Sequence, residues 1–193
     1  CRIFIETIND TSVLTTLRIW VAGCPTGDEA YSLAICLYEF LSDKASTIKV
    51  QIFATDISEQ TIAKARAGIY SLKQINDLSD TRLHQFFTKT DGHYHIKKII
   101  RDMCVFATHN FLKDPPFAKI DLISCRNVLI YMEPFLQKKV FAIFHYALNP
   151  RGFLLLGKSE TAGTASELFQ QVGKKEKLYT KKLSARKFIN VTS

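Results

Sequence analysis

The stretch RIWVAGCPTGDEAYSLAICL, residues 18–37, decides the fold together with KVQIFATDIS, residues 49–58. Residues 17–22 form a mostly apolar run of strand length, which is typical of a parallel strand buried on both faces. Gly23 and Gly27 permit a sharp turn and a close approach of the backbone. A helix and a second buried strand follow. This order predicts the nucleotide-binding half of a doubly wound α/β domain, a Rossmann-like fold.

Polar residues occupy the two places in this unit where a nucleotide ligand is expected. We predict that Thr26 is the N-cap of the helix, with Glu29 three residues later completing a capping box. Asp56 closes the second strand, where a carboxylate can accept hydrogen bonds from the two hydroxyl groups of a ribose. The sequence therefore predicts a ligand that contains a nucleoside.

The glycine pattern departs from the dinucleotide fingerprint G-x-G-x-x-G, which sets a pyrophosphate on a helix N-terminus. Here the helix opens with Asp28 and Glu29, two carboxylates that would repel a phosphate. They suit a cationic ligand such as S-adenosylmethionine, which carries an adenosine, an ammonium and a sulfonium. The alternative is that both carboxylates only cap the helix and complement its dipole. Asp56 at the end of the next strand favours the cofactor.

Size and composition indicate one domain. The chain has 193 residues, 47% of them hydrophobic, enough for one substantial core. It contains no uncharged apolar run of about 18 residues, so we expect no membrane insertion. The N-terminus lacks both an initiator Met and the features of a signal peptide, so we expect a piece of a longer chain, joined to other domains. Five cysteines without a C-x-x-C pair favour reduced thiols in the cytoplasm.

The net charge of +8 raises the question of nucleic-acid binding. Seven lysines and arginines against one glutamate lie from Gln171 onward, so most of the excess belongs to a solvated basic tail. We therefore expect no nucleic-acid partner. His93 and His95 share one face of a possible strand, but ordinary hairpin residues are the favoured interpretation, and we predict no metal site.

The rest of the chain continues the alternation of strands and helices. Asp91-Gly92 predicts a hairpin turn, with Tyr94 and Ile96 on one arm and residues 99–105 on the other. Asn149–Gly152 is predicted as a turn. Further helices are predicted at residues 58–70, 78–87 and 133–148, and further strands at 104–110, 119–127 and 153–159, with a final hairpin after residue 168. The long helix has an apolar stripe of Phe135, Leu136, Val140, Ile143, Phe144 and Leu148.

Four polar signals fall at the predicted carboxyl ends of strands, where ligands of open α/β sheets bind. They are residues 23–29, Asp56, Asn110 and the pair Arg126-Asn127. Arg126 is either a structural ion-pair partner or a guanidinium that holds a substrate carboxylate in a bidentate pair. Tyr131 follows shortly after it.

With these motifs the chain resembles the CheR family of chemotaxis receptor methyltransferases, over residues 17–182. The resemblance rests on WVAGCPTGDEAYSLAI, FATDIS with KARAGIY, VFATHNFL, DLISCRNVLIYMEPFLQKKV and GFLLLGKSE. It is strongest to the version found in hybrid proteins that join CheB-like, CheR-like and sensory segments. It implies one S-adenosylmethionine-binding domain over residues 1–193, with residues 72–103 as an inserted small antiparallel β-subdomain. We expect these 193 residues to lack the family's N-terminal helical domain.

The resemblance also implies roles for individual residues. Gly23, Thr26, Asp28 and Glu29 belong to the cofactor turn, with the carboxylates meeting the methionine ammonium, and Asp56 takes the ribose hydroxyls. Asn110 and Phe111 flank the adenine. Arg126 and Tyr131 line the methyl-transfer site, with Asn127 beside them. Two departures from the family pattern are Ala30, where Pro is usual, and Lys158, where His is common in G-H-S-E.

The activity implied is transfer of a methyl group from S-adenosylmethionine to glutamate side chains on an acidic helix of a chemoreceptor, with S-adenosylhomocysteine as product. A glutamate is ionised near neutral pH, so the reaction needs no general base. A module that binds the cofactor without turnover, as a sensor or scaffold, is the alternative. A methyltransferase for another acceptor and a nucleotide-dependent oxidoreductase are further alternatives, the last disfavoured by the acidic helix start.

Overall fold

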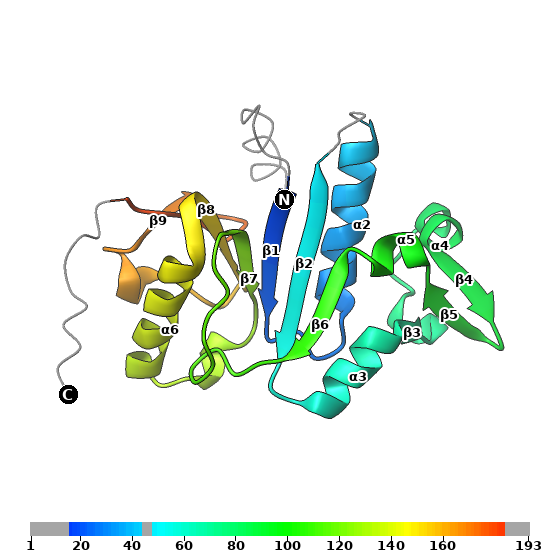
Figure 1. Ribbon diagram of the computed structural model, residues 1–193, viewed down its shortest axis with the longest axis horizontal. Coiled ribbons are helices and arrows are strands. Elements are labelled where there is room, and N and C mark those ends of the chain that lie inside the picture. The colour runs from blue at the N-terminus through cyan, green and yellow to red at the C-terminus, as the bar shows by residue number, and fades with distance from the viewer. Residues whose placement is uncertain (1–15, 44–47, 184–193) are drawn as a thin grey trace. The chain divides into compact units, whose positions relative to one another are not determined.

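The structure, a computed structural model, describes residues 16–43 and 48–183 of the chain. It divides into two compact units, one that runs to Asn110 and one that begins at Phe111. Each unit contains parallel strands connected by helices, shown in chain order by the colours of Figure 1. This confirms the predicted Rossmann-like α/β class.

The first unit is built on three parallel strands in the order β6-β2-β1. Figure 1 shows them side by side. Leu17, Ile19 and Trp20 of β1 are fully buried, as expected for a strand covered on both faces. The elements of this layer are β1 (Thr16–Ala22), α2 (Asp28–Asp43), β2 (Lys49–Asp56), α3 (Glu59–Ala67) and β6 (Cys104–Thr108).

A small antiparallel sheet of order β3-β5-β4 belongs to the same unit. Asp91 and Gly92 both have positive φ, as a two-residue hairpin turn requires, which confirms the predicted turn. The second arm was predicted wrongly, because the strand that pairs with β5 precedes the turn and residues 98–101 are helical. The elements are β3 (Ile69–Tyr70), η1 (Leu72–Gln74), α4 (Asp80–Phe86), β4 (Phe87–Thr90), β5 (His93–Ile96) and α5 (Lys98–Arg101).

In the second unit, β7 and β8 are parallel, and β10 and β9 continue the layer antiparallel in the order β7-β8-β10-β9. The predicted closing hairpin is thus confirmed. The register pairs Cys125 with Leu156, so β7 and β8 end at the same edge. The elements are β7 (Ile120–Cys125), η2 (Leu129–Tyr131), α6 (Pro134–Ala147), β8 (Leu148–Leu156), η3 (Gly163–Ala165), β9 (Phe169–Gly173) and β10 (Leu178–Lys181).

Three local predictions are corrected. Helix α3 ends at Ala67, because Gly68 adopts the left-handed conformation and its N–H closes the last turn. The predicted turn at residues 149–152 lies inside β8, where the pairing with β7 shifts register. Phe135 is 69% exposed, whereas Phe141 is fully buried, so the apolar stripe of α6 begins later than its sequence indicated.

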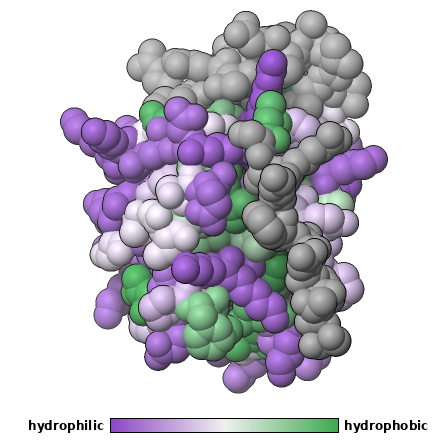
Figure 2. Space-filling model, turned by 90° about the vertical axis from the view of Figure 1, so that its left-hand side faces the viewer, coloured by the Kyte–Doolittle hydropathy of each residue, from purple (hydrophilic) through white to green (hydrophobic). Residues whose placement is uncertain are grey.

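The surface mixes polar and apolar side chains. On the face seen in Figure 2, green apolar areas lie among purple polar ones. Large exposed apolar side chains of the second unit include Ile130, Tyr131, Phe135 and Tyr146. Within residues 16–43 and 48–183, no helix is long and apolar enough to cross a membrane.

Candidate functional site

The turn after β1 is fixed by the end of β2. The backbone N–H groups of Gly23 and Cys24 both donate to the carbonyl oxygen of Thr55, at 2.8 and 2.9 Å. The side chain of Thr55 accepts a further hydrogen bond from Trp20 Nε1 at 2.9 Å. In phosphate-binding loops such backbone N–H groups point at the ligand. Here two of them are already used inside the protein, which favours a ligand without phosphate.

Helix α2 begins at Asp28, as predicted, but its N-cap lies one residue later than predicted. The carbonyl of Gly27 accepts the first helical hydrogen bond, from Tyr31 N at 3.0 Å, so Gly27 and not Thr26 is the N-cap. The Thr26 hydroxyl donates to Asp28 Oδ2 at 2.9 Å. Gly27 has φ +78°, and an added Cβ would lie 3.1 Å from Ala65 Cβ, so a glycine is needed at this point.

The acidic start of α2 changes the titration of its neighbours. Burial raises the pKa of the Cys24 thiol to about 11, and the carboxylates of Glu29 and Asp28 add to the rise. Burial and then Asp28 raise the pKa of Tyr70, whose hydroxyl donates to Thr26 O at 3.1 Å. Cys24 is therefore a protonated thiol and no nucleophile. The turn is a region of negative potential, which suits a cationic ligand.

Asp56 lies half-buried at the end of β2. Its Oδ1 accepts hydrogen bonds from Ser58 N at 2.9 Å and from the Thr61 hydroxyl at 3.4 Å. Both donors belong to the start of α3, so the helix cap orients the carboxylate. Ser58 and Thr61 were not predicted as contributors; the capping pattern was their signal.

The segment after β6 reaches the same edge. Thr108 is paired with Asp56 in the parallel register, and His109 N donates to the Asp56 carbonyl at 2.9 Å. The half-buried Asn110 follows directly. The first unit therefore brings together six of the predicted residues, at the carboxyl ends of its three strands: Gly23, Thr26, Asp28, Glu29, Asp56 and Asn110.

The other four predicted residues belong to the second unit. Phe111 is only 6% exposed and packs on Phe144, with ring centroids 5.9 Å apart, so it serves the core. Arg126 and Asn127 are exposed directly after β7, and Asn127 has a positive φ of 59°. Tyr131, at the end of η2, is 84% exposed. The loop thus presents a cation and a phenol to solvent.

Sequence reasoning missed a side chain that organises this loop. Glu160, only 4% exposed, accepts hydrogen bonds from the backbone N–H groups of Asn127, Val128, Leu129 and Gly157 at 2.7–2.9 Å. In the sequence Glu160 is marked only by its place at the end of the stretch FLLLGKSE. Its four donors are backbone N–H groups, which no sequence pattern reveals.

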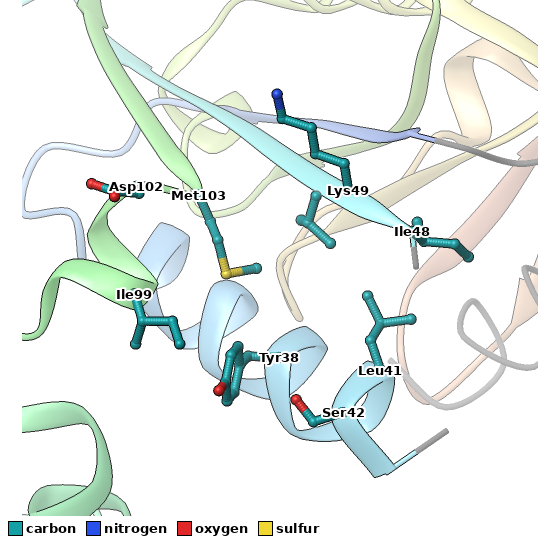
Figure 3. A pocket seen from close by; sticks show the side chains of 9 residues that line it. Tyr38, Leu41, Ser42, Ile48, Lys49, Ile99, Asp102 and Met103 are labelled. Atoms are coloured by element: carbon teal, nitrogen blue, oxygen red, sulfur yellow. The ribbon is translucent and has the colours of Figure 1, made fainter. Parts of the chain in front are cut away.

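A cavity of about 380 Å³ lies elsewhere in the first unit, at the start of β2. Figure 3 shows side chains of α2, β2 and the region of α5 converging on it. Ligands of open α/β sheets bind at the carboxyl ends of strands, and this cavity is at the opposite end of β2. Its lining contains none of the predicted site residues: Tyr38, Leu41, Ser42, Ile48, Lys49, Val50, Ile99, Asp102 and Met103.

Histidines and cysteines form no metal centre in the part of the chain that the structure describes, where no three ligand-type side chains cluster. His93 Nδ1 lies 3.0 Å from the Asp91 carbonyl, within the hairpin. Cys24, Cys36, Cys104 and Cys125 are free thiols.

Comparison with known families decides the identity of the domain. Residues 2–178 match the family described as CheR methyltransferase, SAM binding domain. The chain belongs to this family. The cofactor of the CheR domain is S-adenosylmethionine, and the residues at the carboxyl ends of β1, β2 and β6 fit it. They supply carboxylates, and the N–H groups of Gly23 and Cys24 in the turn are already bound by Thr55.

Several relatives of this CheR domain are considerably longer. It is 38% identical over 172 residues to a 104.1 kDa protein of Rhodobacter capsulatus, covering 89% of this chain and 18% of that protein. It is 37% identical to chemotaxis protein methyltransferase 1 of Pseudomonas aeruginosa, covering 81% and 59%. It is 36% identical to the chemotaxis protein methyltransferase of Borreliella burgdorferi, covering 75% and 52%. The chain thus spans between about a fifth and three fifths of these relatives.

A solved structure, the glycopeptide N-methyltransferase MtfA, matches 80% of this chain and 51% of its own at 12% sequence identity, with a TM-score of 0.46. The family assignment above does not depend on it.

Proposed function

We propose that this domain transfers a methyl group from S-adenosylmethionine to a glutamate side chain of a chemoreceptor-type protein, forming a methyl ester. The observation that carries the proposal is the match of residues 2–178 to the CheR domain, since relatives with this domain are named chemotaxis protein methyltransferases. We further propose that it acts in the cytoplasm, on an acidic helix, as one domain of a longer chain.

The first unit would hold the cofactor. Asp28 and Glu29 attract the ammonium of the methionine moiety; both carboxylates add to the rise that burial causes in the pKa of the neighbouring Cys24 thiol. Asp56, oriented by Ser58 and Thr61, accepts hydrogen bonds from the ribose hydroxyls. Gly23 and Thr26 shape the turn, and Asn110 lies beside the adenine.

The second unit would hold the acceptor. In this proposal Arg126 and Tyr131 line the transfer site, with Asn127 beside them. Exposure of the guanidinium and the phenol supports the proposal, because both can reach an incoming carboxylate. Of the two predicted adenine contacts, Asn110 has more support than Phe111, because the ring of Phe111 packs on Phe144.

The reaction needs alignment rather than proton transfer. When bound, S-adenosylmethionine supplies an electrophilic methyl group and departs as S-adenosylhomocysteine. The acceptor carboxylate is ionised near neutral pH and needs no general base. Arg126 holds one carboxylate oxygen so that the other faces the methyl carbon, and Tyr131 donates a hydrogen bond that fixes the approach. A contact to one oxygen leaves the other nucleophilic.

The test is methyl transfer from labelled S-adenosylmethionine to purified receptor cytoplasmic fragments, with the intact protein. We expect base-labile methyl esters on receptors, and none on fragments whose acceptor glutamates are replaced by alanine. Parallel titrations with S-adenosylhomocysteine and NAD define the ligand. Cofactor binding without transfer to any receptor would support a sensor or scaffold, and NAD binding would refute the assignment.

A further inference from the structure

The loop that carries Arg126 and Tyr131 is held by a buried carboxylate. Glu160 Oε1 accepts from Val128 N at 2.8 Å and Leu129 N at 2.7 Å. Its Oε2 accepts from Asn127 N at 2.9 Å and Gly157 N at 2.7 Å. All four partners are donors, so the side chain acts only as an acceptor, which is the hydrogen-bonding pattern of an ionised carboxylate.

Strand register brings the carboxylate to the loop. Because β7 and β8 are parallel and end together at Cys125 and Leu156, the segments that follow them lie at one edge. A tight turn, in which Glu160 N donates to Gly157 O at 3.0 Å, returns the Glu160 side chain toward the loop. An added Cβ on Gly157 would lie 2.7 Å from both Asn127 Oδ1 and Glu160 Oε2, so the contact requires glycine there.

A second side chain holds the same loop through its carbonyl groups. Gln137, in the first turns of α6, donates from Nε2 to Leu129 O at 3.0 Å and to Met132 O at 3.1 Å. Glu160 therefore satisfies N–H groups before and at the start of η2, and Gln137 satisfies the carbonyl groups of its first residue and of the residue that follows it. The exposed Tyr131 lies between the residues held in this way, and the exposed Arg126 directly precedes the first of them.

We propose that Glu160, with Gln137 as its counterpart, is a positioning residue for methyl transfer. It holds residues 126–131 in one conformation, including the left-handed Asn127, so that Arg126 and Tyr131 meet the acceptor without first being ordered. This inference rests on the proposed function, in which those two residues contact the acceptor. The benefit is entropic, because a rigid site avoids the ordering cost of a free loop.

The test variant is Glu160→Gln in the intact protein. Each oxygen of Glu160 accepts from two N–H groups, so the amide of a glutamine faces two donors in either orientation. We expect amide hydrogen exchange of residues 127–129 and 157 to rise tenfold or more, and kcat for methyl transfer to fall tenfold or more. The KM for S-adenosylmethionine should stay within threefold. The matched control is Glu167→Gln, an exposed glutamate of the same unit, which should change none of these values.

A double-mutant cycle separates positioning from general stability. If Glu160 acts through Arg126 and Tyr131, adding Glu160→Gln to the Arg126→Ala/Tyr131→Phe variant should lower kcat by less than threefold further. If Glu160→Gln lowers kcat by the same factor in the wild-type protein and in that variant, the positioning role is overturned. If Glu160→Gln does not fold, as judged by circular dichroism, Gln137→Met undergoes the same measurements with the same expectations.

The exchange data are independent of activity. Unchanged hydrogen exchange at residues 127–129 would refute the proposal that Glu160 holds the loop, even if methyl transfer is slower. Failure of the unmodified protein to methylate any receptor would instead refute the proposed function, while the exchange data would still show whether Glu160 holds the loop.

Discussion

At the scale of single residues, the proposed cofactor site contains charged side chains that are already oriented by neighbouring groups. Asp56 is oriented by two donors from the start of α3, and Asp28 accepts from Thr26. A carboxylate that is already oriented loses less conformational entropy when a ligand hydroxyl or ammonium binds it. The affinity of this site for a ligand therefore depends on the hydrogen-bond donors that orient the carboxylates as well as on the carboxylates themselves.

Replacing Asp56 by asparagine should weaken S-adenosylmethionine binding. Each charge-assisted hydrogen bond to a ribose hydroxyl contributes about 1.5–3 kcal/mol, so the Kd should rise roughly ten- to a hundredfold. Isothermal titration calorimetry measures the change. Asp77→Asn, an exposed aspartate in the same unit, is the control and should bind normally. An Asp56→Asn variant with normal affinity would contradict the ribose assignment.

Replacing Arg126 by alanine should separate binding from transfer. We expect the Kd for S-adenosylmethionine to stay near the wild-type value and kcat on receptor fragments to fall roughly ten- to a hundredfold, the effect of one lost bond to a charged group. Lys138→Ala, an exposed cation on α6, is the control. If Arg126→Ala loses affinity for the cofactor, Arg126 must instead be assigned to the cofactor site.

At the scale of elements, strand ends and helix starts position these residues. The carbonyl of Thr55 at the end of β2 fixes the turn that follows β1, and the turn after β8 fixes the loop that follows β7. The partner comes from a neighbouring parallel strand in the first case, and from the turn that follows such a strand in the second. Parallel strands place their carboxyl ends together, which is why residues distant in sequence meet there.

Gly157→Ala should destabilise the turn after β8. The added methyl group would overlap Glu160 and Asn127, and overpacking of this kind costs about 1–3 kcal/mol. Urea unfolding followed by circular dichroism measures the change. Gly163→Ala is the matched control, since its nearest neighbour would lie at an ordinary 3.5 Å. Equal stability of the two variants would contradict the tight packing of this turn.

His145 should make the stability of the protein depend on pH. Burial lowers its pKa below 6.5, and its Nε2 lies 3.1 Å from the Lys182 carbonyl. The folded protein thus binds a proton less tightly than the unfolded chain does. Unfolding takes up a proton between the lowered pKa and about 6.5, so stability falls as the pH falls through that window.

The contribution of one histidine to this slope is less than about 1.4 kcal/mol per pH unit. Urea unfolding measures this slope. The pH values should run from about 7.5 to about 5, on either side of the reference pKa of about 6.5. The slope should be shallower in His145→Gln, which keeps a donor near Lys182. Identical slopes in the two proteins would show that His145 titrates alike in the folded and unfolded states.

At the scale of the whole molecule, the described residues form two compact units, and the proposed roles divide between them. The cofactor residues lie largely in the unit that ends at Asn110, and the acceptor residues lie in the other. The matched relatives are longer than this chain. Substrate recognition in the full protein is therefore a property to be tested with the intact chain.

S-adenosylmethionine should stabilise the whole molecule. A ligand at a hundred times its Kd adds about 2.7 kcal/mol when it binds only the folded state. For a chain of this size that corresponds to a rise in Tm of roughly 5–10 °C. Differential scanning calorimetry with S-adenosylmethionine and with NAD at equal concentration measures it. An equal rise with NAD would contradict the ligand assignment.

The sequence determined the alternation of strands and helices, the acidic start of α2 and the aspartate at the end of β2. These are local features, set by apolar periodicity, turn glycines and caps within a few residues. Two errors of the prediction were local as well: Thr26 in place of Gly27 as N-cap, and Phe135 in place of Phe141 in the apolar stripe.

Only the tertiary structure decided which polar groups serve one another. The amides of Gly23 and Cys24 are bound by Thr55, and Glu160 meets the loop after β7 across a sequence separation of 31–33 residues. These contacts involve backbone N–H and carbonyl groups, which nearly every residue possesses, so no side-chain pattern in the sequence predicts them. Strand register alone brings them within hydrogen-bond distance, and register is a property of the folded sheet.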